Sequence, residues 1–530
     1  MIFCWICCSL MRTAVVLLLL AALAAATATP ITHVVIIIEE NRAFDNLFGL
    51  YPFGCPPIVN NITLSVMWPY GLYENYSQLE RSCAEIPWIS VPNVPWAPWL
   101  GQRHPRYAGS AVEENPAEGW VQYHGDYWFG EPTGFVFYSG PQSLEYLSYQ
   151  QVWPLWDLAE EYVLADAFFA PVLGLTEPNR VADLIGRPPG FYTDSATDVV
   201  PFNESIMYQL EAAGVTWGYY VYGYEGGVPY PLTAFSGAEK YVDHYGDYND
   251  FIARLGNCSI PAVSWVMFFG GSDDSYDMHP PHNATAGALA VLRLVEAVEH
   301  SPCWNSTAIF ITFDEGGGFY DQVPPPAVDP FGLGQRVPLI IVSPYAKEGY
   351  VDNNTMSDYT ILAFIDYNWG LPYLTPEVAD SDLRGLLEAF NFSAPPRPPL
   401  DPPNWTYPLP LQYPIHYGYI AAAPMYPTYA EIYRAPGLDV LPWLAAALLI
   451  ALVAFVVSRR ETIAYTAAAI SALGAALSAY IHYAWPMYQF ITQYYLALYG
   501  ITLGAAALWT LSKIVRKARR GQPRPSATAV

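Results

Sequence analysis

The clearest pattern in the chain is an apolar run, long enough for one buried strand, that stops abruptly at acidic or amide side chains. It occurs twice, as residues 33–38 leading into Glu40 and Asn41, and as residues 308–313 leading into Asp314 and Glu315. Uninterrupted Val/Ile runs are typical of parallel strands buried on both faces, and ligands bind beyond the carboxyl ends of such strands. The pattern therefore predicts that these polar side chains meet at one edge of a sheet.

Other segments extend the same alternation. Further strands are predicted at residues 163–165, 216–222, 263–268 and 339–342, and helices at residues 153–162, 206–213 and 287–300. Strands that alternate with helices indicate an α/β fold with a mostly parallel sheet. Residues 51–142 show no period and are rich in Pro, Trp, Tyr and Gly, so we interpret them as loops on the substrate side.

A helix is predicted to begin at Thr176 and to run to Ile185, with Thr176 as its cap and Pro178 in its first turn. A hydroxyl at a helix start lies beside free backbone N–H groups and the positive end of the helix dipole, which favour phosphate. The simpler interpretation, that Thr176 only caps the helix, stays open on spacing alone.

Both ends of the chain carry apolar segments. Residues 11–28 have the charge, apolar core and small-residue exit of a secretory signal peptide, with an N-terminal membrane anchor as the alternative. Near the C-terminus, apolar segments at about residues 440–457, 462–483 and 488–511 are predicted to be three transmembrane helices. Basic residues follow the first and third segments, which predicts that both of these ends are cytoplasmic and that residues 30–436 lie outside.

The predicted organisation therefore has five parts. They are a signal peptide (1–29), a catalytic domain (30–393), a Pro/Tyr-rich stalk (394–436), three transmembrane helices (437–512) and a cytoplasmic tail (513–530).

Four cysteines lie in the part predicted to be outside, where an oxidising compartment favours disulfides. Closeness in sequence favours Cys55–Cys83 and Cys258–Cys303, while other pairings and free thiols stay open. Asn-x-Ser/Thr sequons suit a glycosylated surface protein and all fall in the same part of the chain, at Asn61, Asn75, Asn203, Asn257, Asn283, Asn305, Asn353, Asn391 and Asn404.

Charge and donor type limit the candidate chemistry. The formal net charge of −25 argues against a nucleic-acid partner and disfavours anionic lipid surfaces. Carboxylate and amide oxygens suit a hard divalent cation, so the two acid-tipped strand ends predict a metal site of Glu40, Asn41, Asp314 and Glu315. The residues leave the identity of the metal open.

Several ordered motifs between His33 and about Leu371 resemble the phosphoesterase family that includes bacterial phospholipases C and acid phosphatases, within the alkaline-phosphatase-like superfamily. The matching motifs are residues 40–45, the loop at His104, residues 174–180, Ser264-Trp265, residues 279–281, residues 314–321 with Val323-Pro-Pro, and Ser343-Pro-Tyr. The resemblance implies an alkaline-phosphatase-like three-layer sandwich.

The resemblance also implies roles for individual residues. Thr176 becomes the attacking hydroxyl that forms a covalent phosphoenzyme, and His104 and His279 contact the phosphoryl group, although each histidine could instead be structural. Two positions depart from the family pattern, because Gln322 and Gly316 stand where histidine is usual. Gln322 can donate a hydrogen bond but cannot transfer a proton near neutral pH.

Together these features predict a membrane-anchored phosphoesterase that acts outside the cytoplasm, with phospholipase C activity favoured over acid phosphatase activity on soluble phosphomonoesters. A sulfatase on the same scaffold normally has Cys or Ser at the nucleophile, and this chain has Thr176. A catalytically silent surface protein is the remaining alternative. The predicted substrate is a phosphate ester, with phospholipids among the candidates. The sequence does not specify the oligomeric state.

Overall fold

The computed structural model describes residues 27–49, 51, 66–68, 71–73, 106–127, 132, 134–194, 196–268, 276–326, 332–399, 440–458, 460–484 and 489–520. The predicted leader up to residue 26, Cys55, Cys83, His104, the stalk from residue 400 and the tail from residue 521 lie outside the described residues. Contacts divide the chain into two compact units, one of residues 1–326 and 332–428 and one of residues 327–331 and 429–530.

The first unit is built on an eight-stranded sheet with the order β11-β9-β12-β1-β13-β14-β6-β15. Its strands are β1 (His33–Glu39), β6 (Val163–Ala165), β9 (Trp217–Val221), β11 (Tyr245–Asp247), β12 (Val263–Met267), β13 (Thr307–Phe313), β14 (Leu339–Val342) and β15 (Tyr350–Asp352). Strand β14 is antiparallel to both of its neighbours, whereas the other pairs are parallel. The prediction of a mostly parallel α/β sheet is confirmed.

Strands β1 and β13 lie side by side at the centre of the sheet. Their register pairs His33 with Thr307 and Glu39 with Phe313. Residue 40 therefore emerges beside residue 314, as the two apolar runs predict. Every residue of β13 is buried, as expected for a strand covered on both faces.

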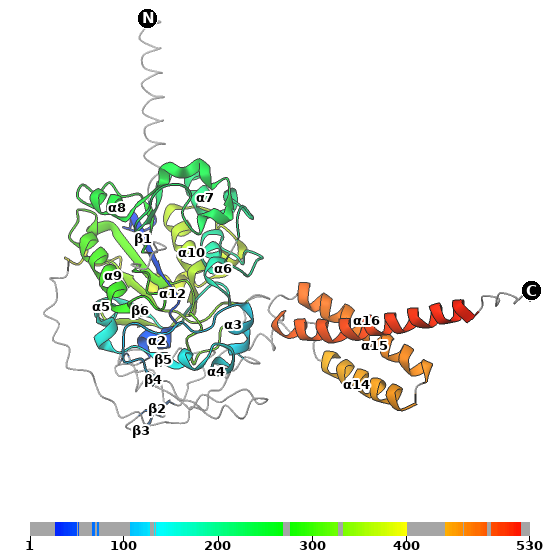
Figure 1. The fold of residues 1–530 in the computed structure, drawn as a ribbon. Coiled ribbons are helices and arrows are strands. Elements are labelled where there is room, and N and C mark those ends of the chain that lie inside the picture. The colour runs from blue at the N-terminus through cyan, green and yellow to red at the C-terminus, as the bar shows by residue number, and fades with distance from the viewer. Residues whose placement is uncertain are drawn as a thin grey trace, which may run out of the picture. The chain divides into compact units, whose positions relative to one another are not determined.

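Helices flank both faces of the sheet, which gives the three-layer arrangement (Figure 1). One group comprises α5 (Tyr149–Glu161), α8 (Tyr248–Leu255) and α9 (Ala284–Glu299), and the other α6 (Thr176–Ile185), α7 (Ile206–Ala213) and α10 (Asp358–Trp369). Shorter helices are α2 (Phe44–Phe48), α3 (Trp120–Asp126), α4 (Phe135–Tyr138), α11 (Pro376–Asp380) and α12 (Leu383–Glu388).

Four small two-stranded sheets complete the first unit. They pair β2 (Val66–Trp68) with β3 (Gly71–Tyr73), β4 (Arg106–Tyr107) with β5 (Glu145–Tyr146), β7 (Phe168–Phe169) with β16 (Met356–Ser357), and β8 (Val200–Pro201) with β10 (Phe235–Ser236). Residues 51–142, interpreted from sequence as loops, thus contain short strands and helices where the structure describes them.

A disulfide joins Cys258 to Cys303, as predicted, with 5.1 Å between the Cα atoms. It links the turn after α8 to the segment before β13. The Nε2 atom of His33 lies 3.6 Å from the Cys258 sulfur, and its Nδ1 atom contacts the Pro261 carbonyl at 3.1 Å.

The second unit contains α14 (Val440–Ser458), α15 (Glu461–Ala484) and α16 (Gln489–Arg520). Two of these helices are long and apolar enough to cross a membrane, over residues Glu461–Ile481 and Tyr494–Val515. The apolar stretch in α14, Val440–Phe455, is shorter. The described residues therefore support two spanning helices by length and composition, where the sequence predicts three.

Candidate active site

The site begins at the carboxyl ends of β1 and β13, where two acidic side chains are bridged by one arginine. Arg180 donates from Nη2 to Oε1 of Glu40 at 3.0 Å and from Nε to Oδ2 of Asp314 at 3.1 Å. All three side chains are buried. Arg180 also donates to the carbonyl of Ile38, at 3.3 Å, so helix α6 is attached directly to the end of the central strand.

Asn41 is held in the same cluster by both its backbone and its side chain. Its N–H donates to Oδ1 of Asp314 at 3.0 Å, and its Nδ2 donates to Oε2 of Glu118 at 2.5 Å. Its Oδ1 accepts from the Thr176 hydroxyl at 3.4 Å. The backbone φ of Asn41 is 60°, a left-handed conformation that Asn tolerates better than most residues.

Glu315 closes the buried side of the cluster. Its Oε2 accepts from the Tyr123 hydroxyl and, at 2.6 Å, from the N–H of Gly317. Its Oε1 is buried and has no hydrogen-bond partner among the described residues. An unpartnered buried carboxylate oxygen is costly, so this atom is a natural ligand for a cation.

Burial raises the pKa of all three carboxyl groups, Glu40, Asp314 and Glu315, although Arg180 opposes the rise for the first two. One guanidinium cannot neutralise three buried carboxylates. With the amide oxygen of Asn41 they form an all-oxygen donor set, which fits a hard divalent cation. The predicted metal residues are thus brought to one place, with Thr176 beside them.

A more compact group of potential ligand atoms lies elsewhere in the described part of the chain. His33, Cys258 and Cys303 place their ligand atoms within 4.8 Å of one another. The two sulfurs are bonded to each other, so neither is a thiolate ligand. Among the described residues, the acidic oxygens of the candidate site do not form so compact a group, and Arg180 bridges two of the acidic side chains, Glu40 and Asp314.

Thr176 is the first residue of α6, and Leu175 is the cap residue, with no side-chain cap bond. The prediction that Thr176 caps the helix is therefore wrong, because the cap lies one residue earlier. The Thr176 hydroxyl is not used for capping and faces Asn41 instead. The Glu177 amide donates to Asp194 at 2.8 Å, and Pro178 has no N–H. Among the first-turn amides, only that of Thr176 has no hydrogen-bond partner among the described residues.

His279 lies in the segment between β12 and α9, and its side chain is 28% exposed. Its Nδ1 lies 2.6 Å from the Pro280 carbonyl, which can only accept, so Nδ1 carries a hydrogen. Its Nε2 lies 3.6 Å from Oε1 of Glu118. His279 is thus joined to the cluster through Glu118, whereas His104 lies outside the described residues.

The two departures from the family pattern have different surroundings. A Cβ atom at position 316 would lie 2.0 Å from Oε1 of Gln335, so glycine leaves room for that buried side chain. The N–H of Gln322 donates to Oδ2 of Asp45 at 3.0 Å. The backbone at position 322 is therefore held by Asp45, in the segment that follows β13 and its acidic residues Asp314 and Glu315.

Sequence reasoning missed Arg180, Glu118 and Tyr123. Arg180 could have been found, because it follows Thr176 by four residues and so shares its helix face. Glu118 lies just before α3 and Tyr123 lies within it, in a stretch without hydrophobic periodicity, so no local pattern points to them.

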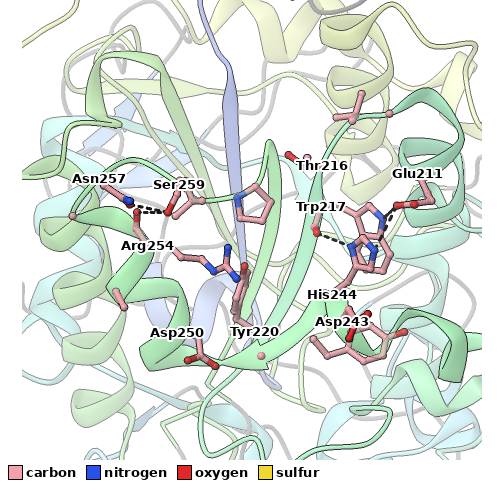
Figure 2. Close-up of a pocket in the computed structure, with 18 residues that line it drawn as sticks. Glu211, Thr216, Trp217, Tyr220, Asp243, His244, Asp250, Arg254, Asn257 and Ser259 are labelled. Carbon is pink, nitrogen blue, oxygen red and sulfur yellow. Dashed lines mark hydrogen bonds and ion pairs between the residues drawn. The ribbon is translucent and has the colours of Figure 1, made fainter.

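A separate cavity of about 1090 Å³ is lined by other residues, which Figure 2 shows. It is lined at the beginnings of β9 and β11, by residues that include Trp217 and Tyr245, whereas the acidic cluster lies at strand carboxyl ends. His244 stacks on Trp217 there with 4.0 Å between ring centroids. None of the predicted site residues lines this cavity, so its size does not mark the candidate active site.

Comparison with known proteins places these residues in a wider context. The model of the phosphoesterase family matches residues 31–372. The non-hemolytic phospholipase C of Burkholderia pseudomallei is 26% identical over 446 residues, covering 69% of this chain and 59% of that protein. Phospholipase C B of Mycobacterium tuberculosis is 25% identical over 453 residues, covering 72% and 81%.

Among solved structures, a protein in the alkaline phosphatase superfamily from Vibrio parahaemolyticus aligns with 14% identity and a TM-score of 0.32. The alignment covers 52% of this chain and 72% of that one. A TM-score this low does not establish a shared fold, so the fold class rests on the sheet and helices described above.

Gly317 provides a test of how tightly the cluster is built. Its φ is +64°, and an added Cβ would lie 2.2 Å from the Asn41 carbonyl oxygen. We expect Gly317→Ala to lower the free energy of unfolding by roughly 2–4 kcal/mol, through left-handed strain and overpacking together. It should also weaken binding of divalent metal, because Asn41 must move.

The matched control is Gly190→Ala, where φ is +83° and an added Cβ meets nothing within 4 Å. It should cost about 1–2 kcal/mol, from strain alone, and leave metal binding unchanged. Chemical denaturation and metal titration measure the two effects. Equal losses in the two variants would show that Asn41 is not confined by Gly317.

Proposed function

Because the chain belongs to the phosphoesterase family, we propose that it hydrolyses phosphate esters through a phosphothreonine formed at Thr176. The observation that carries this proposal is the position of the Thr176 hydroxyl, 3.4 Å from Oδ1 of Asn41 and beside the buried acidic cluster. A hydroxyl at that place can act as a nucleophile that divides one difficult displacement into two easier steps.

The residues that would hold a divalent metal are Glu40, Asn41, Asp314 and Glu315. When bound, a divalent cation polarises the phosphoryl oxygens and lowers the pKa of the nearby hydroxyl. Arg180 stays bonded to the acidic side chains and fixes helix α6, which carries Thr176, against the end of the sheet. Phosphoryl transfer needs chiefly positioning and charge stabilisation, and this cluster supplies both.

His279 and His104 bind the phosphoryl group in this proposal. The imidazole of His279 also supplies the proton that the leaving oxygen takes when the P–O bond breaks. This assignment gives the chain a proton donor although Gln322 replaces the usual histidine. In the first step the Thr176 proton passes to solvent as its oxygen bonds to phosphorus. In the second step water replaces Thr176 on phosphorus and gives one proton to the His279 imidazole, the threonine oxygen regains a proton from solvent, and inorganic or monoester phosphate leaves.

The substrate we favour is a phospholipid, with soluble phosphomonoesters as the second candidate. The relatives named above are phospholipases C, and the chain spans 59% of the first and 81% of the second. Apolar C-terminal helices would hold the catalytic unit at a membrane, where lipid head groups are within reach. The net charge of −25 disfavours anionic lipids and so favours a zwitterionic head group.

We further propose that the catalytic unit lies outside the cytoplasm. The basic residues that follow α14 and end α16 favour a cytoplasmic location for those ends. Of the six sequon asparagines in the described structure, all but Asn353 are exposed, which suits glycosylation. They are Asn203, Asn257, Asn283, Asn305, Asn353 and Asn391.

The reaction is tested by assaying a phosphomonoester, a phosphodiester and phosphatidylcholine in parallel with a panel of divalent metals. Wild type should cleave at least one of them, and Thr176→Ala should lose activity by at least about 100-fold, since it removes the nucleophile. Thr233→Ala, an exposed threonine outside the site, should behave as wild type. Full activity in Thr176→Ala, or no cleavage by wild type, would refute the mechanism.

Topology has a separate test. Protease added to intact cells should release the unit that carries the sheet while a tag after Val530 stays protected, because the terminal basic residues hold that end inside. Permeabilised cells provide the control in which the tag is digested. Digestion of the tag in intact cells would reverse the orientation.

A further inference from the structure

Glu118 stands at the meeting point of the metal cluster and His279. Its carboxylate lies just before α3 and is 17% exposed. Oε2 accepts from Nδ2 of Asn41 at 2.5 Å, and Oε1 lies 3.6 Å from Nε2 of His279. Asn115 and Tyr123 hold this carboxylate in place, with bonds of 2.7 and 3.3 Å.

We propose that Glu118 is a positioning residue that acts through Asn41 and His279 together; this inference rests on the function proposed above. Its Oε2 orients the metal ligand Asn41, and its Oε1 faces the proton donor His279. A single carboxylate therefore sets where Asn41 and His279 lie relative to each other.

The contact with Asn41 decides which way its amide points. An amide has a donor end and an acceptor end of nearly the same shape. Because Nδ2 is bonded to a carboxylate, which can only accept, Oδ1 must face the other side, where it meets Thr176. Without Glu118 the amide could turn over and present N–H groups to the cation and to the nucleophile.

The contact with His279 works on the opposite side of the carboxylate. Nδ1 of His279 is committed to the Pro280 carbonyl, so Nε2 is the atom that can exchange a proton with substrate. Glu118 places its negative charge beside that atom. When the leaving oxygen departs with the P–O bond electrons, it takes the Nε2 proton, and the imidazole recovers a proton as water cleaves the phosphothreonine.

Two variants separate these contacts. Glu118→Gln keeps an oxygen that can accept from Asn41 but loses the charge that faces His279, whereas Glu118→Ala loses both. Glu114→Gln is the matched control, because Glu114 is an exposed neighbour on the same segment. Thermal unfolding of each purified protein verifies that the fold is retained.

The first readout compares p-nitrophenyl phosphate, whose leaving group needs no proton, with an alkyl phosphate, whose leaving group does. Glu118→Gln should lower kcat for the alkyl ester by about 10- to 100-fold and change kcat for the aryl ester much less. A purely structural role would lower both alike. Equal effects on the two esters, or none beyond Glu114→Gln, contradict the role of Glu118 at His279.

The second readout is metal affinity, measured by titrating Mn²⁺, Ca²⁺ and Zn²⁺ separately into chelator-treated protein. Glu118→Ala should bind the preferred ion about 10-fold or more weakly, and Glu118→Gln should recover most of that loss. Unchanged affinity in Glu118→Ala contradicts its role at Asn41. If wild type cleaves neither ester, the proposed function is wrong, and this titration alone decides the inference.

Discussion

The structure of the candidate site depends on buried negative charge at the ends of two central strands. Register places Glu40 beside Asp314, and like charges so close in a buried place require compensation. Arg180 provides part of it and, because it belongs to α6, it also locks the helix that carries Thr176 onto the sheet. Breaking such a buried pair by removing one partner typically costs about 3–5 kcal/mol. The buried carboxylates that suit a cation thus also hold helix α6 in place through Arg180.

Residues outside the central sheet also fix the positions of the side chains in the cluster. Glu118, just before α3, and Tyr123, within α3, contact the cluster, and Gly317 permits the close approach of the Asn41 backbone. These contacts fix the side-chain amide and the acidic oxygens in one arrangement before any ligand binds. Such preorganisation lowers the cost of assembling a metal and phosphoryl site, and a rigid sheet with loops at its carboxyl edge is well suited to it.

Much of this could be predicted from the sequence, for physical reasons. Uninterrupted apolar runs identified β1 and β13, and the residues that end them gave Glu40 and Asp314. Helix Ile206–Ala213 and strand Leu339–Val342 were predicted at their observed bounds. The reversed direction of β14 was not predictable, because a buried apolar run reads the same in either direction. Glu118 was missed because its role comes from tertiary contacts in a stretch without hydrophobic periodicity. The role of His104 and the pairing of Cys55 with Cys83 stay predictions, because these residues lie outside the described part of the chain.

The central claim is that the acidic cluster binds a divalent cation for phosphoester chemistry. The most direct measurement is elemental analysis of purified wild type, Asp314→Ala and an exposed-acid control, Asp243→Ala, after metal loading and dialysis. The account predicts that wild type and Asp243→Ala retain the same divalent metal and that Asp314→Ala loses most of it. Equal metal content in all three proteins would contradict the account.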